Sequence, residues 1–289
     1  MMAGEIHTFF DGSWYQGDVP VMKAGDHGAW LGSTVFDGAR MVNGLMPDLR
    51  PHLERVNRSA EAMMIKPTYS VEDMIALVRD GLKKFATGEA VYIRPMYWGI
   101  TGEESVVEPA FGGGTGFCMA LEAMPMPAED SAATLCKTRF RRPTLDTAVC
   151  NAKTGSLYPN NGRMLAEARA RGFSNALVTD QLGNVAESAT ANIFMVKDGE
   201  VFTPIANGTF LSGLTRARHI KNLRADGVTV HEAVLTYADF EGADEVFLSG
   251  NFAKVTPVKQ FEDTHYEIGP MTKRARDLYW DWAKSDMAL

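Results

Sequence analysis

The segment AVCNAKTGSLYPNN, residues 148–161, places a single lysine, Lys153, among small and amide side chains. No carboxylate occurs from residue 147 to residue 165, so no neighbouring Asp or Glu in the chain would hold the amine in its charged form. An uncharged lysine amine is a nucleophile that forms an imine with a carbonyl group. The segment therefore predicts a catalytic lysine, and an ordinary loop lysine is the alternative.

Two further segments have the composition of anion-binding sites. FLSGLTRARH (210–219) puts Gly213 and Thr215 at the start of a predicted helix, where amide donors and the positive end of the helix dipole attract anions. FLSGNFAKVTP (247–257) ends a predicted strand shortly before Asn251, where exposed amides could also bind phosphate. Together they predict a phosphate site. A plain helix cap and a plain turn are the alternatives.

Two charged residues and one glycine-rich loop complete this set. Glu187 lies among small and apolar residues, so it either faces solvent or faces a cation such as a protonated pyridine nitrogen. Arg55 lies on a predicted helix and could bind phosphate with its rigid fork, or could be a surface arginine. The loop FGGGTG (111–116) lacks a Lys-Ser/Thr ending and a following helix, so we interpret it as a flexible connection.

Composition limits the class of protein. The chain has 289 residues, of which 45% are hydrophobic and 22% charged, as in soluble globular proteins of one or two domains. The net charge of −7, without a basic cluster, argues against nucleic acid or an anionic membrane as partner. Three cysteines without close pairing, and no apparent signal peptide or membrane span, predict a cytoplasmic protein without disulfides. No metal site is predicted, and Cys150 is interpreted as a small apolar filler.

Periodicity predicts the first elements that must position these residues. An Asp-Gly pair predicts a hairpin over residues 7–15. Apolar residues recur at helical spacing in 49–64, and Ser70 and Asp73 form a predicted capping pair for the next helix. The expected buried stripes are Leu53, Val56, Ala60 and Met63 in the first helix and Met74, Ile75, Val78, Leu82 and Phe85 in the second.

Two strands and a linker follow. Residues 90–99 predict a strand with Tyr92 and Arg94 on one face, and residues 116–123 predict another. Two prolines among polar residues then predict a linker. The expected organisation is an N-terminal domain over 1–123, a linker over 124–134 and a larger domain over 135–289 that carries Lys153.

The second half mixes short strands with scattered helices and lacks a regular βαβ alternation. This pattern predicts the α+β class with two domains. The predicted helices are 162–172, ended by Gly172, then 214–227 and 271–285. The predicted strands are 175–180, 185–196, 201–204, 228–234 and 245–250.

Taken in order, these segments resemble a known family. The pieces DHGAWLGSTVFDGAR, HLERVNRSA, AKTGSLYPNN and ESATANIFMVKDG, followed by SGLTR and SGNFAKVTPV, are similar to fold-type IV pyridoxal-phosphate enzymes, the branched-chain and D-amino-acid aminotransferases. Each piece alone is a weak signal, but their joint order over nearly the whole chain is specific. The resemblance implies two domains with pyridoxal 5′-phosphate between them, and a homodimer or higher homo-oligomer.

The resemblance also implies roles around the cofactor ring. Lys153 matches the Schiff-base lysine, Tyr158 matches the partner of the phenolic oxygen, and Glu187 matches the carboxylate that faces the pyridine nitrogen. The implied reaction is a ping-pong transamination, in which the freed lysine amine moves the α-proton.

Four further positions match the phosphate-binding residues of the family. Arg55 matches its arginine, and the amides of Leu214 and Thr215 match the helix start. Asn251 stands where the family often has threonine.

The substrate is expected to be a branched-chain L-amino acid, with 2-oxoglutarate as acceptor. The Tyr92 and Arg94 pair resembles the residues that seat the substrate carboxylate in the branched-chain subgroup, and a cross-strand structural pair is the alternative. D-amino-acid enzymes tend to have histidine where this chain has Met96, and amine transaminases tend to lack the pair. The expected substrate-contacting residues are Phe36, Gly38, Arg40, Tyr92, Arg94 and Phe252.

Three departures from the branched-chain pattern keep other donors open. Trp30 and Leu31 stand where tyrosine is usual, residues 122–128 lack aromatic side chains, and Phe252 replaces a small residue. The alternatives are a transaminase for D-amino acids or (R)-amines, which could also accept aromatic or β-amino donors, and an aminodeoxychorismate lyase on the same fold. A non-catalytic binding protein is a third option, disfavoured because the cofactor positions are intact.

Overall fold

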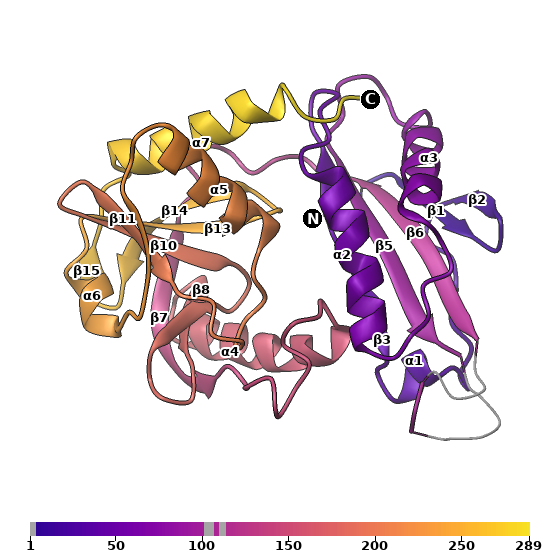
Figure 1. The fold of residues 1–289 in the computed structure, drawn as a ribbon, viewed down its shortest axis with the longest axis horizontal. Helices are drawn as coiled ribbons and strands as arrows, with labels where there is room; N and C mark the ends of the chain where they lie inside the picture. The colour runs from indigo at the N-terminus through magenta and orange to yellow at the C-terminus, as the bar shows by residue number, and fades with distance from the viewer. Residues whose placement is uncertain (1–3, 101–106, 110–113) are drawn as a thin grey trace. The chain divides into compact units, whose positions relative to one another are not determined.

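The computed structural model describes residues 4–100, 107–109 and 114–289 (Figure 1). The chain divides into two compact units. Unit 1 contains Met1–Met126, Asn151–Ser156 and Asp286–Leu289, and unit 2 contains Pro127–Cys150 and Leu157–Ser285. Half of the glycine-rich loop interpreted above as a flexible connection, residues 111–113, lies outside the described residues.

Unit 1 is built on an antiparallel sheet with the order β2-β1-β6-β5-β3, in which β4 also pairs with β5. The predicted hairpin is confirmed, with Asp11 and Gly12 both in the left-handed region (φ 49° and 77°) that a tight turn requires. The strands are β1 (Ile6–Phe10), β2 (Ser13–Gln16), β3 (Thr34–Phe36), β4 (Ala39–Met41), β5 (Val91–Gly99) and β6 (Thr115–Ala123).

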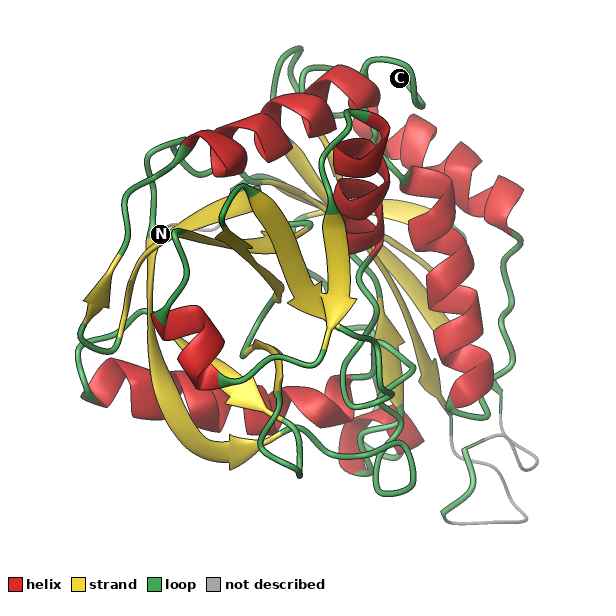
Figure 2. Cartoon of the chain, turned by 60° about the vertical axis from the view of Figure 1, so that its left-hand side comes forward, coloured by secondary structure: helices red, strands yellow, loops and turns green. Residues whose placement is uncertain are grey.

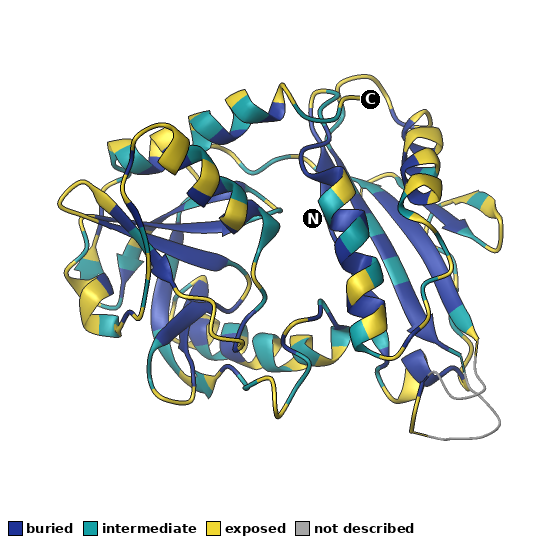
Figure 3. Ribbon diagram, viewed as in Figure 1, coloured by how far each residue is buried: buried dark blue, intermediate teal, exposed yellow. Residues whose placement is uncertain are grey.

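The described helices of unit 1 are α1 (His27–Trp30), α2 (Leu49–Ala62) and α3 (Val71–Leu82). Helices α2 and α3 pack their apolar stripes on this sheet. In α2 the predicted stripe is buried at Leu53, Val56 and Ala60, and in α3 the predicted capping pair forms a complete capping box. Burying these stripes against the strands forms one core for unit 1, seen as dark blue strands beneath the helices in Figure 3.

The side chains at the start of β5 alternate between the buried core and a face that carries two predicted substrate residues. Val91 and Ile93 are buried, whereas Tyr92 and Arg94 are only partly buried, as expected for alternation along a strand. The predicted faces are therefore confirmed. Tyr92 pairs directly with Arg40 of β4.

Unit 2 is built on a mixed sheet with the order β12-β11-β10-β13-β14-β7-β8-β9, with β15 on β14. The pairs β11–β12, β14–β7 and β7–β8 are parallel and the others antiparallel. Its strands are β7 (Ala133–Arg141), β8 (Asn175–Thr179), β9 (Val185–Ser188), β10 (Asn192–Lys197), β11 (Glu200–Pro204), β12 (Val230–Ala233), β13 (Glu245–Gly250), β14 (Lys254–Phe261) and β15 (Thr264–His265).

Unit 2 also contains helices, and Figure 2 draws the helices of the chain in red and its strands in yellow. The helices of unit 2 are α4 (Tyr158–Ala170), α5 (Leu214–Ala225), α6 (Tyr237–Glu241) and α7 (Pro270–Ala283), and a 3₁₀ turn, η1, spans Gly155–Leu157. The mixture of helices with largely antiparallel strands agrees with the predicted α+β class. Among the described residues, no helix is both long and apolar enough to cross a membrane.

Several boundaries differ from the prediction. The single strand expected over 185–196 is two strands, because Ser188 Oγ accepts hydrogen bonds from the amides of Thr190 and Ala191 and turns the chain. Strands β7 and β14 were not predicted, and α4 begins at Tyr158 instead of residue 162.

The division of the chain also differs in one respect. The change of unit after Met126 falls inside the expected linker, but the segment Asn151–Ser156 groups with unit 1, whereas Lys153 was expected in the larger domain. The reason is tertiary: the segment's backbone bonds to β3 and α2, which no local pattern reveals.

Candidate active site

The lysine segment is held against β3 and α2 by its backbone. The Lys153 carbonyl accepts from the Phe36 amide at 3.1 Å, and its amide donates to Ser59 Oγ at 3.0 Å. Thr154 forms a bridge with Val35, and its hydroxyl donates to the carbonyl of residue 34. These bonds fix the main chain of Lys153, so its side chain starts from a defined position.

The Lys153 amine lies over an aromatic ring. Its Nζ is 4.8 Å from the centroid of the Phe36 ring, and the side chain is partly buried. Phe36 was predicted to contact substrate, so the structure brings the predicted nucleophile and one predicted substrate residue together.

Arg55 is the centre of a buried charge cluster in unit 1. Its Nε and Nη2 donate to the two oxygens of Asp37 at 2.6 and 2.8 Å, and His52 Nδ1 donates to Asp37 Oδ1 at 2.7 Å. Burial by itself raises the pKa of the Asp37 carboxyl, but Arg55 and His52 outweigh it and hold the pKa well below its ordinary value. A charged carboxylate therefore orients the guanidinium.

Asp37 and His52 were missed by the sequence analysis. Asp37 lies in the segment DHGAWLGSTVFDGAR and His52 begins the segment HLERVNRSA, two of the segments that carry the family resemblance. Nothing in the spacing indicated that the two motifs would meet, because strand and helix contacts are not encoded locally.

Three other predicted substrate residues of unit 1, Gly38, Arg40 and Tyr92, lie close together. A Cβ on Gly38 would lie 2.0 Å from the Tyr92 hydroxyl, so glycine lets the phenol occupy that space. Arg40, which pairs with Tyr92 across the strands, is fully buried. Its guanidinium donates to the Met124 carbonyl at 2.7 Å and to Met126 Sδ at 2.8 Å.

These contacts change the interpretation of the two arginines. Arg40 anchors the last residues of unit 1, which belong to the expected linker, in addition to any role toward substrate. Arg94, on the same face as Tyr92, is about one-third exposed, with Nη1 at 3.7 Å from Glu122 Oε2. This distance is compatible with the structural pair considered as the alternative, so the contact of Arg94 with substrate stays a prediction.

In unit 2, Glu187 is buried beside a guanidinium. Arg142 Nη2 lies 2.9 Å from Glu187 Oε1, and Asn192 Nδ2 donates to Glu187 Oε2 at 3.1 Å. Arg142 is itself fixed, because its Nη1 donates to Asn161 Oδ1 at 2.7 Å. Glu187 is thus a held carboxylate facing a cation inside the unit, the second of the two possibilities left open by its sequence context.

Asn192 links this carboxylate to the start of α5. Its Oδ1 accepts from the Gly213 amide at 3.1 Å, and Gly213 is the N-cap of α5. Glycine has no side chain to cap the helix, and a Cβ there would meet Asn192 Oδ1 at 2.1 Å. The first turn, with Leu214 and Thr215, therefore has no side-chain cap, as suits an anion site.

The end of β13 lies next to this group. Ser249 pairs directly with Asn192, and the predicted anion residue Asn251 follows two residues later. The Ser249 hydroxyl and the Asn251 amide nitrogen are buried atoms without a hydrogen-bond partner among the described residues. Unsatisfied buried donors are costly, so they call for an acceptor from outside the chain.

Two predicted residues lie at exposed positions within unit 2. Tyr158, the first residue of α4, is 41% exposed, and Phe252, in the turn after β13, is 51% exposed. In unit 1, Trp30 and Leu31 are exposed as well. Their contacts with cofactor or substrate stay predictions.

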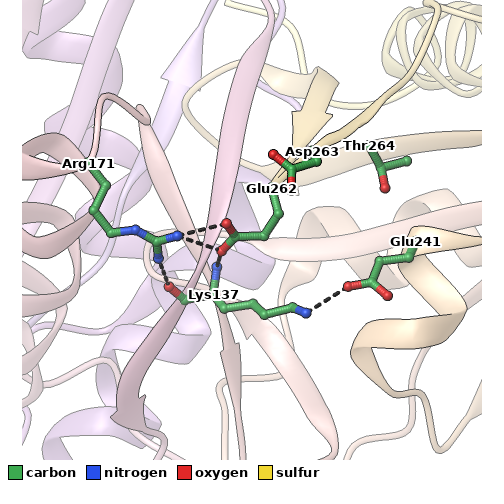
Figure 4. A pocket seen from close by; sticks show the side chains of 6 residues that line it. All are labelled: Lys137, Arg171, Glu241, Glu262, Asp263 and Thr264. Atoms are coloured by element: carbon green, nitrogen blue, oxygen red, sulfur yellow. Dashed lines mark hydrogen bonds and ion pairs between the residues drawn. The ribbon is translucent and has the colours of Figure 1, made fainter.

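One cavity of about 490 Å³ in unit 2 does not involve any predicted residue (Figure 4). Both of its cations are paired, Lys137 with Glu241 and Arg171 with Glu262, each at 2.7 Å, and Asp263 adds a third carboxylate. The lining is therefore net negative, which does not favour a phosphate group. We therefore do not assign the active site to it.

The remaining expectations concern metals and thiols. Within the described ranges, no cluster of three or more His, Cys, Asp or Glu side chains could hold a metal ion. All three cysteines are buried and free. Burial raises the pKa of the Cys150 thiol, which disfavours the nucleophilic thiolate and agrees with its interpretation as a filler.

The residues present fit a phosphorylated pyridine aldehyde. Unit 2 supplies unsatisfied donors and an uncapped helix start for an anion, and a buried carboxylate for a ring nitrogen. Unit 1 supplies a lysine amine with a fixed backbone.

Comparison with known proteins identifies the family. The family model described as amino-transferase class IV matches residues 34–261. The branched-chain-amino-acid aminotransferase of Escherichia coli (strain K12) is 30% identical over 291 aligned positions, which cover 95% of this chain and 92% of the relative.

Solved structures agree with this match. An aminotransferase from Brucella abortus bound to the cofactor PLP is 53% identical, with a TM-score of 0.95 over 97% of this chain and 99% of that one. A branched-chain aminotransferase from Thermoproteus uzoniensis with norvaline is 26% identical, with a TM-score of 0.88 over 98% and 96% of the two chains.

These matches confirm the predicted fold and the prediction of an enzyme. The family model covers most of the chain, and both structures superpose over nearly all of it. The chain belongs to the class IV aminotransferases.

Proposed function

We propose that this enzyme transfers an amino group from a branched-chain L-amino acid to 2-oxoglutarate by a ping-pong mechanism. Amino acids and 2-oxo acids are the substrates that an aminotransferase requires. The branched-chain preference is supported by the name and the near full-length coverage of the Escherichia coli relative. The D-amino-acid, (R)-amine and lyase alternatives have no comparable support.

The cofactor is pyridoxal 5′-phosphate, in keeping with the family and with the Brucella structure that contains it. When bound, it supplies an aldehyde that takes up the amino group and a ring that stores the electron pair left when the Cα–H bond breaks. Lys153 and Arg55 are the residues of unit 1 that would hold it. Those of unit 2 are Tyr158, Glu187, Leu214, Thr215 and Asn251.

The observation that carries this proposal is the position of Lys153. Its amine lies over the Phe36 ring at 4.8 Å, on a backbone fixed by Ser59 and Phe36. A fixed main chain limits the positions that the amine can reach, which favours repeated transfer of one proton. Lys153 Nζ is therefore assigned as the base that takes the proton from the substrate Cα and would pass it to the cofactor carbon that receives the amino group.

Glu187 acts as the partner of a protonated ring nitrogen. Its carboxylate already accepts from Asn192 and lies against Arg142, so its position does not depend on a ligand. Positioned charge of this kind lowers the reorganisation needed during reaction.

The substrate is bound by the set around Tyr92. Phe36 supplies an apolar surface, and Tyr92 and Arg94 supply groups that bind a carboxylate. Gly38 leaves room for the Tyr92 hydroxyl, and Arg40 is positioned across from it. Phe252, from unit 2, is proposed to limit the size of the substrate.

The test is a panel of half-reactions on the purified, cofactor-loaded enzyme. L-leucine, D-alanine and (R)-1-phenylethylamine are each mixed with it, and the loss of cofactor absorbance is followed. Rapid conversion by L-leucine alone supports the proposal, whereas no conversion by L-leucine contradicts it. Pyruvate release from aminodeoxychorismate without any keto acid would identify a lyase instead.

The assembly and location are further proposals. We infer a homodimer from the resemblance described above, which sedimentation equilibrium can test. A cytoplasmic location stays a prediction from the cysteine usage, and fractionation of the producing cells can test it.

A further inference from the structure

A fully buried lysine lies beside the proposed phosphate site. Lys254, the first residue of β14, is 0% exposed, and its Nζ donates to Asn251 Oδ1 at 2.5 Å. We propose that Lys254 is a positioning residue for the phosphate group of the cofactor and acts through Asn251. This inference rests on the proposed function.

The backbone brings the two residues together. Lys254 pairs with Gly250 where β13 and β14 meet, so residues 251–253 form the turn between them. Lys254 has a φ of 64°, a left-handed conformation that is unfavourable for a residue other than glycine. The tight turn imposes this conformation, and the same turn presents Asn251.

The ammonium group determines which way the Asn251 amide points. An ammonium only donates hydrogen bonds, so the atom of Asn251 that faces it must be the carbonyl oxygen. The amide nitrogen is then directed elsewhere as a donor. This nitrogen is one of the buried atoms without a partner among the described residues.

An Asn251 amide nitrogen with a fixed direction is suited to bind an anion such as phosphate. Without Lys254, the Asn251 amide could rotate and present its oxygen, which repels phosphate. With Lys254, only the nitrogen is available, and the ammonium charge one hydrogen bond away adds attraction. Threonine, which the family often has at this position, has a hydroxyl that can donate without such orientation.

Neighbouring residues place this donor within the proposed site of unit 2. Ser249, whose buried hydroxyl also has no partner among the described residues, lies two positions before Asn251. Ser249 pairs with Asn192, which accepts from the Gly213 amide at the start of α5. One connected set of bonds thus joins the turn to the helix start.

A purely structural lysine is the competing interpretation. Lys254 Nζ lies 5.3 Å from the Tyr279 ring centroid, and its carbonyl lies 3.2 Å from His219 Nε2, so it also belongs to a packed interior. The two interpretations differ in one measurable way. A structural lysine would affect stability and all ligands alike, whereas a positioning lysine affects phosphate binding and depends on Asn251.

The experiment is a double-mutant cycle on ligand affinity. Wild type, Lys254→Met, Asn251→Ala and the double variant are prepared without cofactor, and the Kd values for pyridoxal phosphate and for pyridoxal are measured by fluorescence. Lys259→Met, an exposed lysine on the same strand, is the matched control. Melting temperatures are recorded for all variants, and inorganic phosphate is used as a competing ligand.

We expect Lys254→Met to weaken binding of pyridoxal phosphate about tenfold, the effect of losing one charge-assisted hydrogen bond. Binding of pyridoxal should change less than about twofold. In the Asn251→Ala background the Lys254 substitution should add little, because its effect passes through the amide. The control should behave as wild type.

Equal weakening for both ligands, additive effects of the two substitutions, or unchanged affinity would each overturn the inference. If Lys254→Met does not fold, Lys254→Gln, which keeps a polar head group, is compared in the same cycle. A wild-type protein that binds no pyridoxal phosphate would contradict the proposed function itself, so the two failures are distinguishable.

Discussion

Arg55 and Asp37 form a buried fork in which two nitrogens of the guanidinium meet two oxygens of the carboxylate, at 2.6 and 2.8 Å. Arg55 was predicted to bind phosphate, yet two of its nitrogens are engaged by the protein. The fork orients the guanidinium before any ligand arrives, which lowers the entropic cost of binding.

Replacing Asp37 by asparagine should destabilise unit 1. The buried guanidinium would keep its charge and lose its counter-ion, which costs about 3–5 kcal/mol. Urea unfolding measures the loss. Glu72→Gln, which breaks an ion pair of Arg50 on the surface, is the control and should leave stability unchanged. Equal midpoints for the two variants would contradict this prediction.

The same carboxyl predicts a dependence of stability on pH. The pKa of Asp37 is lowered in the folded protein, because Arg55 and His52 outweigh the opposite effect of burial. Its contribution is therefore fully present above the unfolded pKa of about 4 and is lost as the pH falls below that value. Unfolding of wild type and Asp37→Asn at pH 3 and pH 6 measures this. The difference between them should be smaller at pH 3.

Replacing Lys153 by alanine should abolish the half-reaction with L-leucine and leave the fold intact. The residue contributes through its backbone bonds to Ser59 and Phe36, which alanine retains. Borohydride reduction followed by peptide mapping should place the pyridoxyl group on the Lys153 peptide in wild type only. Label on any other peptide would refute the assignment.

Replacing Arg142 by methionine should lower kcat by about ten- to a hundredfold, the usual range for residues that orient a catalytic group. Glu187 would lose the guanidinium at 2.9 Å that holds it and keep the bond from Asn192. Steady-state kinetics and the pH dependence of the cofactor absorbance measure the effect. Arg139→Met, an exposed arginine of β7, is the matched control. An unchanged absorbance profile would argue against a role through Glu187.

Replacing Gly38 by alanine should raise the KM for the amino donor about tenfold or more, because the new methyl group would occupy the space of the Tyr92 hydroxyl. The matched control is Gly162→Ala in α4, where a Cβ meets nothing within 4 Å. That change should stabilise the helix by about 0.5–1 kcal/mol and leave KM unchanged. A normal KM for Gly38→Ala would remove Tyr92 from the proposed site.

The sequence was enough to predict those elements that neighbouring residues in the chain stabilise. The left-handed pair at Asp11 and Gly12 makes a hairpin wherever it occurs, and the capping box of Ser70 and Asp73 is closed within four residues. The apolar stripe of α2 likewise follows from helical spacing. The order of the motifs along the chain was enough to indicate the enzyme class, which the family match confirms.

The split between β9 and β10 was missed because alternation continues across residues 189–191, and only the Ser188 hydrogen bonds reveal the turn. Strand β7 was missed for a related reason: its partners, β8 and β14, lie far away in the chain, so its stability comes from pairing. Strand β14 was also missed, although it pairs with β13 across the turn at residues 251–253.

By itself, the sequence determined which groups are present: a lysine without a neighbouring carboxylate, a glutamate among small and apolar residues, and two segments with the composition of anion-binding turns. The tertiary structure alone decided their partners, such as Phe36 under the Lys153 amine, Arg142 beside Glu187 and Lys254 beneath Asn251. The physical reason is that residue type sets reactivity, whereas the position and charge state of a side chain depend on groups distant in sequence that folding brings into contact.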